Sequence, residues 1–214
     1  MENQLKNDFE KIVKTSGFSK KDIDIKKIYL NEFIKKGFPN RKLENWKFSD
    51  ISQIIKKNIG ELDFYNDYSF PNKIDPSIFV SGLEHNKIVF INGRIEKIEF
   101  NYEDENKIEI LDEIELKDKT SFENSLIDLN NAFTNKYYKI VVKENYTLKK
   151  PLIIYHTTNE NLKLKNINLR LDFLLKKNSC LKLIDISNDL SEKNFINTLY
   201  NFELNQDSIL KNYK

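Results

Sequence analysis

A seven-residue pattern recurs three times in the last third of the chain and limits how this region can fold. Each copy places Asn or Asp three positions after an apolar residue and three before a leucine: Val142-x-x-Asn145-x-x-Leu148, Leu175-x-x-Asn178-x-x-Leu181 and Leu204-x-x-Asp207-x-x-Leu210, at offsets of 33 and 29 residues. Apolar strands flank each polar corner. Because such a unit cannot bury its own apolar face, the pattern predicts stacked units, as in a solenoid or β-helix. An antiparallel sandwich with coincidental spacing is the alternative.

The first sixty residues have the apolar spacing of helices instead. One helix is expected over residues 3–16, before a glycine. A second should begin after Ser19, where an acid three residues on gives an arrangement close to a capping box, and end at Gly37. A third, shorter helix is expected over residues 49–57. The three apolar faces comprise Leu5, Phe9, Ile12 and Val13; Ile25, Ile28, Phe33 and Ile34; and Ile51, Ile54 and Ile55.

A connector and a hairpin follow. Residues 61–86 are rich in Asp, Asn and Ser and contain two prolines, a composition typical of a linker. Beyond them, two apolar runs surround Asn92-Gly93. This dipeptide suits a two-residue type I′ turn, in which both residues have positive φ, so a β-hairpin is expected over residues 87–100.

One more helix is expected inside the β-rich part of the chain, over residues 122–135, through Phe122, Leu126, Leu129 and Phe133. The predicted fold class is therefore α+β, in three parts. A small N-terminal helical domain spans residues 1–60, a connector spans 61–86, and a β-rich region over 87–214 leads into an incomplete β-helix.

The composition excludes several classes of site and protein. Cys180 is the only cysteine, which excludes an intramolecular disulfide framework and a cysteine-cluster metal site and favours a reducing compartment. The five glycines are isolated, so P-loop and dinucleotide-binding motifs are excluded. No apolar run approaches the roughly 18 residues of a membrane span, and the N-terminus lacks the apolar core of a signal peptide. The expected protein is soluble and cytoplasmic.

Charge is unevenly distributed along the chain. Residues 1–60 carry 14 basic and 8 acidic side chains, residues 61–130 carry 7 and 17, and residues 131–214 carry 14 and 8. The net charges are therefore +6, −10 and +6. A basic end can meet nucleic acid or an acidic partner, but lysines interleaved with acids on solvated helix faces are the favoured interpretation.

No arrangement of residues identifies a catalytic site. His85 and His156 have no His, Cys or carboxylate at metal-ligand spacing, and for His156 a satisfied histidine at a strand end is favoured over a general base. Cys180 is expected to be a buried, inert thiol. The runs Glu103-Asp104-Glu105 and Asp112-Glu113 could hold a hard cation, but solvated acids are favoured. We assign no catalytic, cofactor-binding or metal-binding residue.

The densest group of unusual residues is Gly37-Phe-Pro-Asn-Arg-Lys-Leu-Glu-Asn-Trp-Lys-Phe-Ser-Asp50, which contains the only tryptophan. The favoured interpretation is structural: Trp46 and Phe48 anchor a loop on the helices while Arg41 and Glu44 form an ion pair. The alternative is a docking surface, because Trp and Arg are favoured as interface anchors.

This segment resembles the N-terminal signature of the SufD family of Fe–S cluster assembly proteins. The matching residues are Gly37, Pro39, Arg41, Glu44, Trp46, Lys47, Phe48, Ser49, Asp50 and Ile51. Later segments resemble further family motifs in the same order: Val89-Phe-Ile-Asn-Gly93, Leu129-Asn-Asn-Ala-Phe133, Lys150-Pro-Leu152 and Arg170 before Leu171–Leu175. The chain departs from the family at Lys177-Asn-Ser-Cys180, where a glycine-containing corner is common.

The resemblance implies a non-enzymatic scaffold subunit that works with SufB and with the SufC ATPase in Fe–S cluster assembly. It also implies a right-handed parallel β-helix of which this chain is the N-terminal half, because SufD-like chains are about twice as long. The family residues implicated in building the cluster, and the SufC-binding surface, lie in the other half. No cofactor-binding residue is therefore carried onto this chain, and Cys180 matches no such position.

Two other functions remain open on the residues alone. A carbohydrate-active β-helix enzyme, such as a polysaccharide lyase, would need clustered Asp, Arg and Lys on one face, and only Arg170 and scattered lysines are available. A stand-alone interaction or nucleic-acid-binding module could use the basic helical end, and would show strongly salt-dependent binding. We expect no membrane partner.

Overall fold

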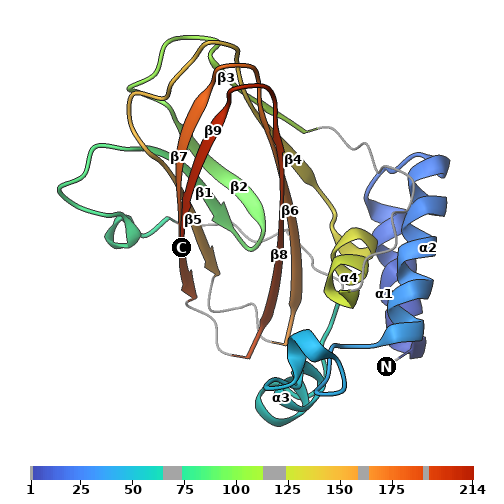
Figure 1. Ribbon diagram of the computed structural model, residues 1–214. Helices are drawn as coiled ribbons and strands as arrows, with labels where there is room; N and C mark the ends of the chain where they lie inside the picture. The colour runs from blue at the N-terminus through green and yellow to red at the C-terminus, as the bar shows by residue number, and fades with distance from the viewer. Residues whose placement is uncertain (1, 65–73, 113–123, 159–163, 190–192) are drawn as a thin grey trace.

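The computed structural model describes residues 2–64, 74–112, 124–158, 164–189 and 193–214. Within these residues the chain is an α+β structure with four α-helices and nine β-strands. The helices gather at one side of the strands, which form two long, facing layers (Figure 1). None of the described helices has the length and apolar character needed to cross a membrane.

The first two helices lie within one residue of their predicted bounds. α1 covers Glu2–Thr15 and α2 covers Lys20–Lys36. Ser19 caps α2, because its hydroxyl oxygen accepts a hydrogen bond from the backbone N–H of Asp22. Gly37 ends α2 with a φ of 68°, a conformation that glycine adopts without steric penalty. The predicted capping of α2 is thus confirmed.

The two shorter helices are also present. α3 covers Ile51–Asn58 and starts at Asp50, whose carboxylate accepts the backbone N–H three residues on. α4 covers Ser125–Phe133 and is capped by Asn124. Phe122, which we also expected in this last helix, lies outside the described residues.

The helices share one apolar core with α4, far along the chain. α4 packs mainly against α2, and both contribute fully buried residues. The predicted face of α2 is only partly correct, because Ile28 is 47% exposed. The buried positions of α2 are Ile25, Lys26, Tyr29, Leu30 and Phe33, so Tyr29 takes the inward place and Ile28 lies about 100° away on the helix. Ile54 of α3 is likewise 46% exposed.

Lys26 joins the helices through a fully buried side-chain amino group. Its Nζ donates to the backbone carbonyls of Asn131, Ala132 and Thr134, at 3.0, 3.3 and 2.7 Å. These carbonyls belong to the C-terminal end of α4, where a helix leaves acceptors unpaired and favours positive charge. Burial lowers the pKa of Lys26 to about 7.

The predicted hairpin is confirmed. β1 (Asn86–Ile91) and β2 (Arg94–Glu99) pair antiparallel around Asn92 and Gly93, whose φ angles are 53° and 80°. A Cβ on Gly93 would lie 2.9 Å from a methyl carbon of Ile167, so this glycine also allows a close approach to a neighbouring strand. A type I′ turn therefore fits both the backbone and its surroundings.

The remaining strands alternate between two sheets. They are β3 (Ile108–Leu111), β4 (Tyr137–Val142), β5 (Leu152–Thr158), β6 (Asn166–Leu175), β7 (Cys180–Asp189), β8 (Phe195–Leu204) and β9 (Ile209–Tyr213). One sheet has the order β2-β1-β5-β7-β9 and the other the order β3-β4-β6-β8. The pairings among β4 and the later strands, namely β4–β6, β5–β7, β6–β8 and β7–β9, are all parallel. An antiparallel sandwich is therefore the wrong interpretation of this region.

The three predicted corners stack in register. Asn145, Asn178 and Asp207 all have φ between 55° and 57°, in the left-handed region that Asn and Asp tolerate. The residues that precede the corners face one another, since Val142 pairs with Leu175 and Leu175 with Leu204. The leucines that follow the second and third corners are also aligned, because Leu181 pairs with Leu210. The interior between the two sheets is mainly apolar around the corners, and Val142, Leu175 and Leu181 are completely buried in it.

A segment of the predicted connector covers the outer face of β5. It contains the short 3-10 helix η2 (Pro76–Ile78). The hydroxyl oxygen of Tyr155 accepts the backbone N–H of Val80 at 3.1 Å and hydrogen-bonds His85 Nε2 at 2.8 Å. His85 is thereby a structural residue, held also by a 2.7 Å hydrogen bond from Nδ1 to the carbonyl of Leu83.

Candidate functional site

The tryptophan-containing segment forms a compact series of turns between α2 and α3. Its centre is the 3-10 helix η1 (Glu44–Trp46). The backbone N–H of Trp46 donates to the carbonyl of Leu43 at 2.8 Å, and that of Ser49 donates to the carbonyl of Trp46 at 2.8 Å. The N–H of Ile51 reaches back to the carbonyl of Pro39 at 3.1 Å. The local backbone is therefore largely satisfied by its own turns.

The side chains of this segment do not form the anchor that we expected. Phe48 is 86% exposed, whereas Trp46 is half-buried. Glu44 pairs with Lys47 at 3.1 Å instead of with Arg41. The structural interpretation of Phe48 and of the Arg41–Glu44 pair is therefore wrong.

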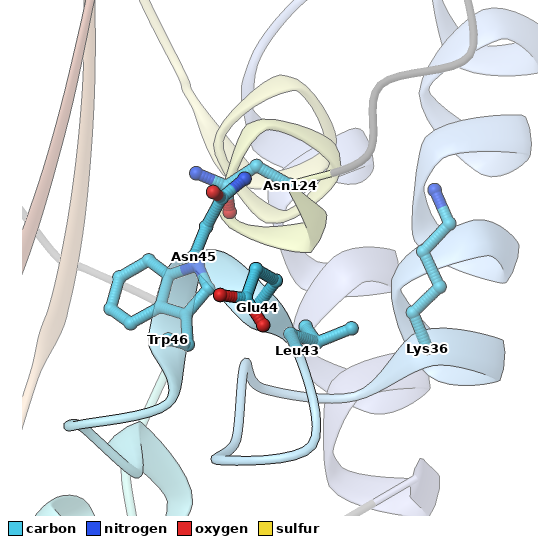
Figure 2. Close-up of a pocket in the computed structure, with 6 residues that line it drawn as sticks. All are labelled: Lys36, Leu43, Glu44, Asn45, Trp46 and Asn124. Carbon is cyan, nitrogen blue, oxygen red and sulfur yellow. The ribbon is translucent and has the colours of Figure 1, made fainter.

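A pocket of about 620 Å³ lies beside Trp46 (Figure 2). Its lining residues come from the end of α2, from η1 and from the residue that caps α4: Lys36, Leu43, Glu44, Asn45, Trp46 and Asn124. Figure 2 shows Trp46 and Lys36 at opposite sides, with Glu44 and Leu43 between them and Asn45 reaching toward Asn124. The Lys36 side chain is held by Asp128, whose carboxylate accepts a hydrogen bond from Lys36 Nζ at 2.7 Å. The pocket lining therefore combines the apolar side chains of Trp46 and Leu43 with polar and charged ones.

Positive charge is exposed along the same segment as Trp46. Arg41 and Lys42 are exposed, and the structure gives neither an ion pair within the described residues. Lys47 lies 5.2 Å from the ring centroid of Phe48, a cation–π distance. Nearby acids are already engaged, since Glu44 pairs with Lys47 and Asp50 caps α3. We call Arg41, Lys42, Leu43, Trp46, Lys47 and Phe48 the Trp46 surface.

A second polar group lies between the two sheets, around His156. His156 Nε2 is 2.7 Å from the hydroxyl oxygen of Tyr200 on β8 and 3.2 Å from Oδ1 of Asp185 on β7. Its ring stacks on Phe90 of β1, with centroids 5.3 Å apart and planes at 17°. Lys214 Nζ approaches the other carboxylate oxygen of Asp185 at 3.7 Å. We call His156, Asp185 and Tyr200 the interior triad.

The environment of the interior triad shifts the pKa values of Asp185 and Tyr200. Burial acts to raise the pKa of Asp185, but its interactions with His156, Tyr200 and Lys214 outweigh this effect and hold that pKa below its usual value. Burial and the neighbouring Asp185 charge raise the pKa of Tyr200. The interior triad links three strands. Because the His156 and Asp185 side chains are only 8% and 9% exposed, it is poorly placed to act on an external substrate.

Of the interior triad, sequence reasoning found only His156, and placed it at a strand end. It lies within β5 and is satisfied there by Tyr200. Asp185 and Tyr200 were missed because they come from other strands. Their signal was alternation: Asp185 lies two residues after the buried Leu183, on the same face of its strand.

The acidic loop has a structural role that the sequence did not predict. Both carboxylate oxygens of Glu103 accept hydrogen bonds, from the backbone N–H groups of Lys149 and Lys150, from the Asn86 amide and from the Tyr146 hydroxyl, at 2.6–3.1 Å. Glu103 is therefore not a simply solvated acid. Asp112 pairs with Lys136 at 2.9 Å, and Glu113 lies outside the described residues.

Two other candidates are also placed. Cys180 begins β7 and is only partly buried, so the prediction of a buried thiol is wrong. Arg170 donates through Nε and one terminal nitrogen to both carboxylate oxygens of Asp172, at 2.9 and 3.0 Å, and through the other to Asn131. It is thus committed to neighbouring side chains. Among the described residues no group of three or more His, Cys, Asp or Glu could hold a metal ion.

No protein-family model matches the chain, and no curated protein matches it.

Proposed function

We propose that the chain is part of a SufD-like scaffold subunit, which assembles Fe–S clusters together with SufB-like and SufC-like proteins. In this proposal the subunit is non-catalytic, the SufC-like partner supplies the ATPase activity, and the cluster is cargo of the whole complex. The observation that carries the proposal is the register of the three corners. They recur at the predicted spacing, share one left-handed conformation and join parallel strands that alternate between two sheets.

This register supports a finer description of the fold. We propose that β4–β9 are the first coils of a right-handed parallel β-helix, with the Asn and Asp corners stacked along one edge. Such coils bury apolar residues only when a neighbouring coil covers them. Leu204, Ile209 and Tyr213, on the outermost strands of the two sheets, are 49%, 53% and 57% exposed. Further coils of the same kind would cover these side chains.

The N-terminal motif also supports the proposal. Its glycine and aspartate have backbone roles, since Gly37 ends α2 and Asp50 caps α3. Its aromatic residues Trp46 and Phe48 instead remain accessible. A motif that combines fixed turns with displayed side chains suits a subunit whose work is to hold partners.

The test has two steps. The source gene is sequenced past codon 214, and we expect further Asn or Asp corners at offsets close to those of the first three. The full product is then co-expressed with the SufB-like and SufC-like proteins of the same genome, and we expect the three to co-purify. Residues 1–214 alone should bind only weakly, because the family's SufC-binding surface lies beyond them.

A matched pair of variants controls for the coil itself. Leu181→Asp places a charge at a completely buried position, whereas Lys182→Asp changes its exposed neighbour. Co-purification should be lost in the full-length Leu181→Asp protein and kept in Lys182→Asp. A stop codon directly after Lys214, or a full product that binds neither partner, would refute the assembly role.

A further inference from the structure

We infer that the Trp46 surface binds an acidic amphipathic helix of a partner protein. The apolar side chains of this helix would pack on Phe48 and enter the pocket beside Trp46, and its carboxylates would meet the exposed Arg41 and Lys42 of the same segment. This inference goes beyond the assembly role and does not depend on it.

The apolar part of the argument rests on Phe48 and the pocket. Phe48 is the most exposed large hydrophobic residue of the described chain, at 86%, and Leu43 at the pocket is 43% exposed. Interface hot spots favour a buried aromatic anchor beside a pocket that receives a side chain of the partner. A pocket of about 620 Å³ is within the size range of binding clefts.

The charge around the surface indicates the sign of the partner. Arg41 and Lys42 are exposed on the loop, and Lys56 and Lys57 lie in the last turn of α3, which is only about 12 Å long. Residues 40–58 contain five basic and two acidic side chains. Of the two acids, Glu44 pairs with Lys47 and Asp50 caps α3. Acidic groups on a partner would be attracted here, and basic ones repelled.

The backbone of the surface indicates the form of the partner. A partner strand needs an edge with unpaired N–H and C=O groups. Here the N–H groups of Trp46, Ser49 and Ile51 all donate within the segment, which leaves side chains as the main means of recognition. A helix that inserts side chains into a groove uses this mode, and the concave pocket suits it better than it suits a flat lipid surface.

The chain contains its own reporter for the test. Trp46 is the only tryptophan and lines the pocket, so its fluorescence reports on occupancy directly. The probe is a synthetic helical peptide with Leu and Phe on one face and Glu on the other, titrated into residues 1–214. We expect a saturable blue shift of Trp46 emission that weakens with salt. A peptide with Lys in place of Glu should bind at least tenfold more weakly.

Two variants locate the binding. Phe48→Ser should weaken peptide binding at least tenfold. Because Phe48 is exposed, the circular dichroism spectrum of this variant should match that of the parent protein. Tyr213→Ser is the matched control, an exposed aromatic residue in β9 that should leave binding unchanged. Replacement of both Arg41 and Lys42 by Ser should weaken binding and reduce its salt dependence.

Three results would overturn the inference. The first is no response of Trp46 to the acidic peptide up to about 1 mM, the limit of weak specific binding. The second is equal binding by the parent and by Phe48→Ser. The third is a response only to phosphatidylserine vesicles, with none to the peptide, which would make the surface a membrane contact. None of these results involves the SufB-like or SufC-like proteins, so failure here is separable from failure of the assembly role.

Discussion

The side-chain amide of Asn178 donates to the side-chain oxygen of Asn145 at 2.8 Å, although 33 residues separate them. Their backbones also stack, because the N–H of Asn145 donates to the carbonyl of Lys177 and that of Asn178 donates to the carbonyl of Gln206. Both residues have a φ of 55°. At Asn178 one residue thus meets two needs of the corner, a left-handed backbone and a side-chain hydrogen bond to the preceding corner.

These two needs can be separated by substitution at Asn178. Asn178→Gly still allows the positive φ but loses the side-chain hydrogen bond to Asn145. It should lower the free energy of unfolding by about 0.5–1.5 kcal/mol. Asn178→Ala loses both and should lower it by roughly 1 kcal/mol more, because alanine is strained at positive φ. Urea unfolding monitored by circular dichroism measures the difference. Equal stability of the Gly and Ala variants would contradict a backbone role for this corner.

Glu103 should behave as a structural carboxylate. Glu103→Gln replaces an oxygen acceptor by an NH₂ group facing donors, and we expect the free energy of unfolding to fall by about 1–3 kcal/mol. Burial opposes the ionised form, but hydrogen bonds from Tyr146, Lys149, Asn86 and Lys150 outweigh it and lower the pKa of Glu103. A lowered native pKa means that this stabilisation is present above the unfolded value of 4.5 and disappears as pH falls through the native pKa.

Glu105 provides the control for this prediction. It lies in the same loop but is exposed, so Glu105→Gln should change stability by less than about 0.5 kcal/mol. Unfolding of the two variants and the parent is compared at pH 7 and pH 3.5. If Glu103→Gln is as stable as Glu105→Gln at pH 7, the hydrogen-bonded carboxylate contributes nothing to stability.

The sequence predicted the parts of the fold that local chemistry determines. Ser19 and Gly37 bound a helix through capping, and Asn92-Gly93 forms a hairpin because both residues accept positive φ. The corners at Asn145 and Asn178 could be predicted because their spacing repeats. In each case the signal lies within a few residues or recurs at a fixed offset.

Features that depend on distant pairing were not predictable in this way. A lone phenylalanine in a sequence is read as buried, and only the turns around Phe48 show that nothing covers it. His156, Asp185 and Tyr200 meet through the register of three strands in two sheets. Alternation indicates which face each residue takes, but not which residue it will meet.

Lys26 should give the stability of the protein an unusual pH dependence. Its native pKa of about 7 lies below its ordinary value of 10.5, so between these values the unfolded chain binds more protons than the native one. The contribution of Lys26 to stability therefore rises with pH above 7, by up to about 1.4 kcal/mol per pH unit, and is lost as pH falls toward 7. Lys26→Met removes this dependence, whereas Lys27→Met, at an exposed neighbour, should keep it. Urea unfolding at pH 7, 8 and 9 tests this, and parallel curves for the parent and Lys26→Met would contradict it.

The interior triad should be energetically coupled across strands. Asp185→Asn and Tyr200→Phe each remove one polar partner of a buried group, so each should lower the free energy of unfolding by about 1–3 kcal/mol. Because both groups contact His156, the double variant should lose less than the sum of the single losses, by roughly 0.5–2 kcal/mol. Ser187→Ala, at a more exposed position on the same strand, serves as the control and should be nearly neutral. Additive losses in the double-mutant cycle would mean that the three groups act separately despite their 2.7 and 3.2 Å contacts.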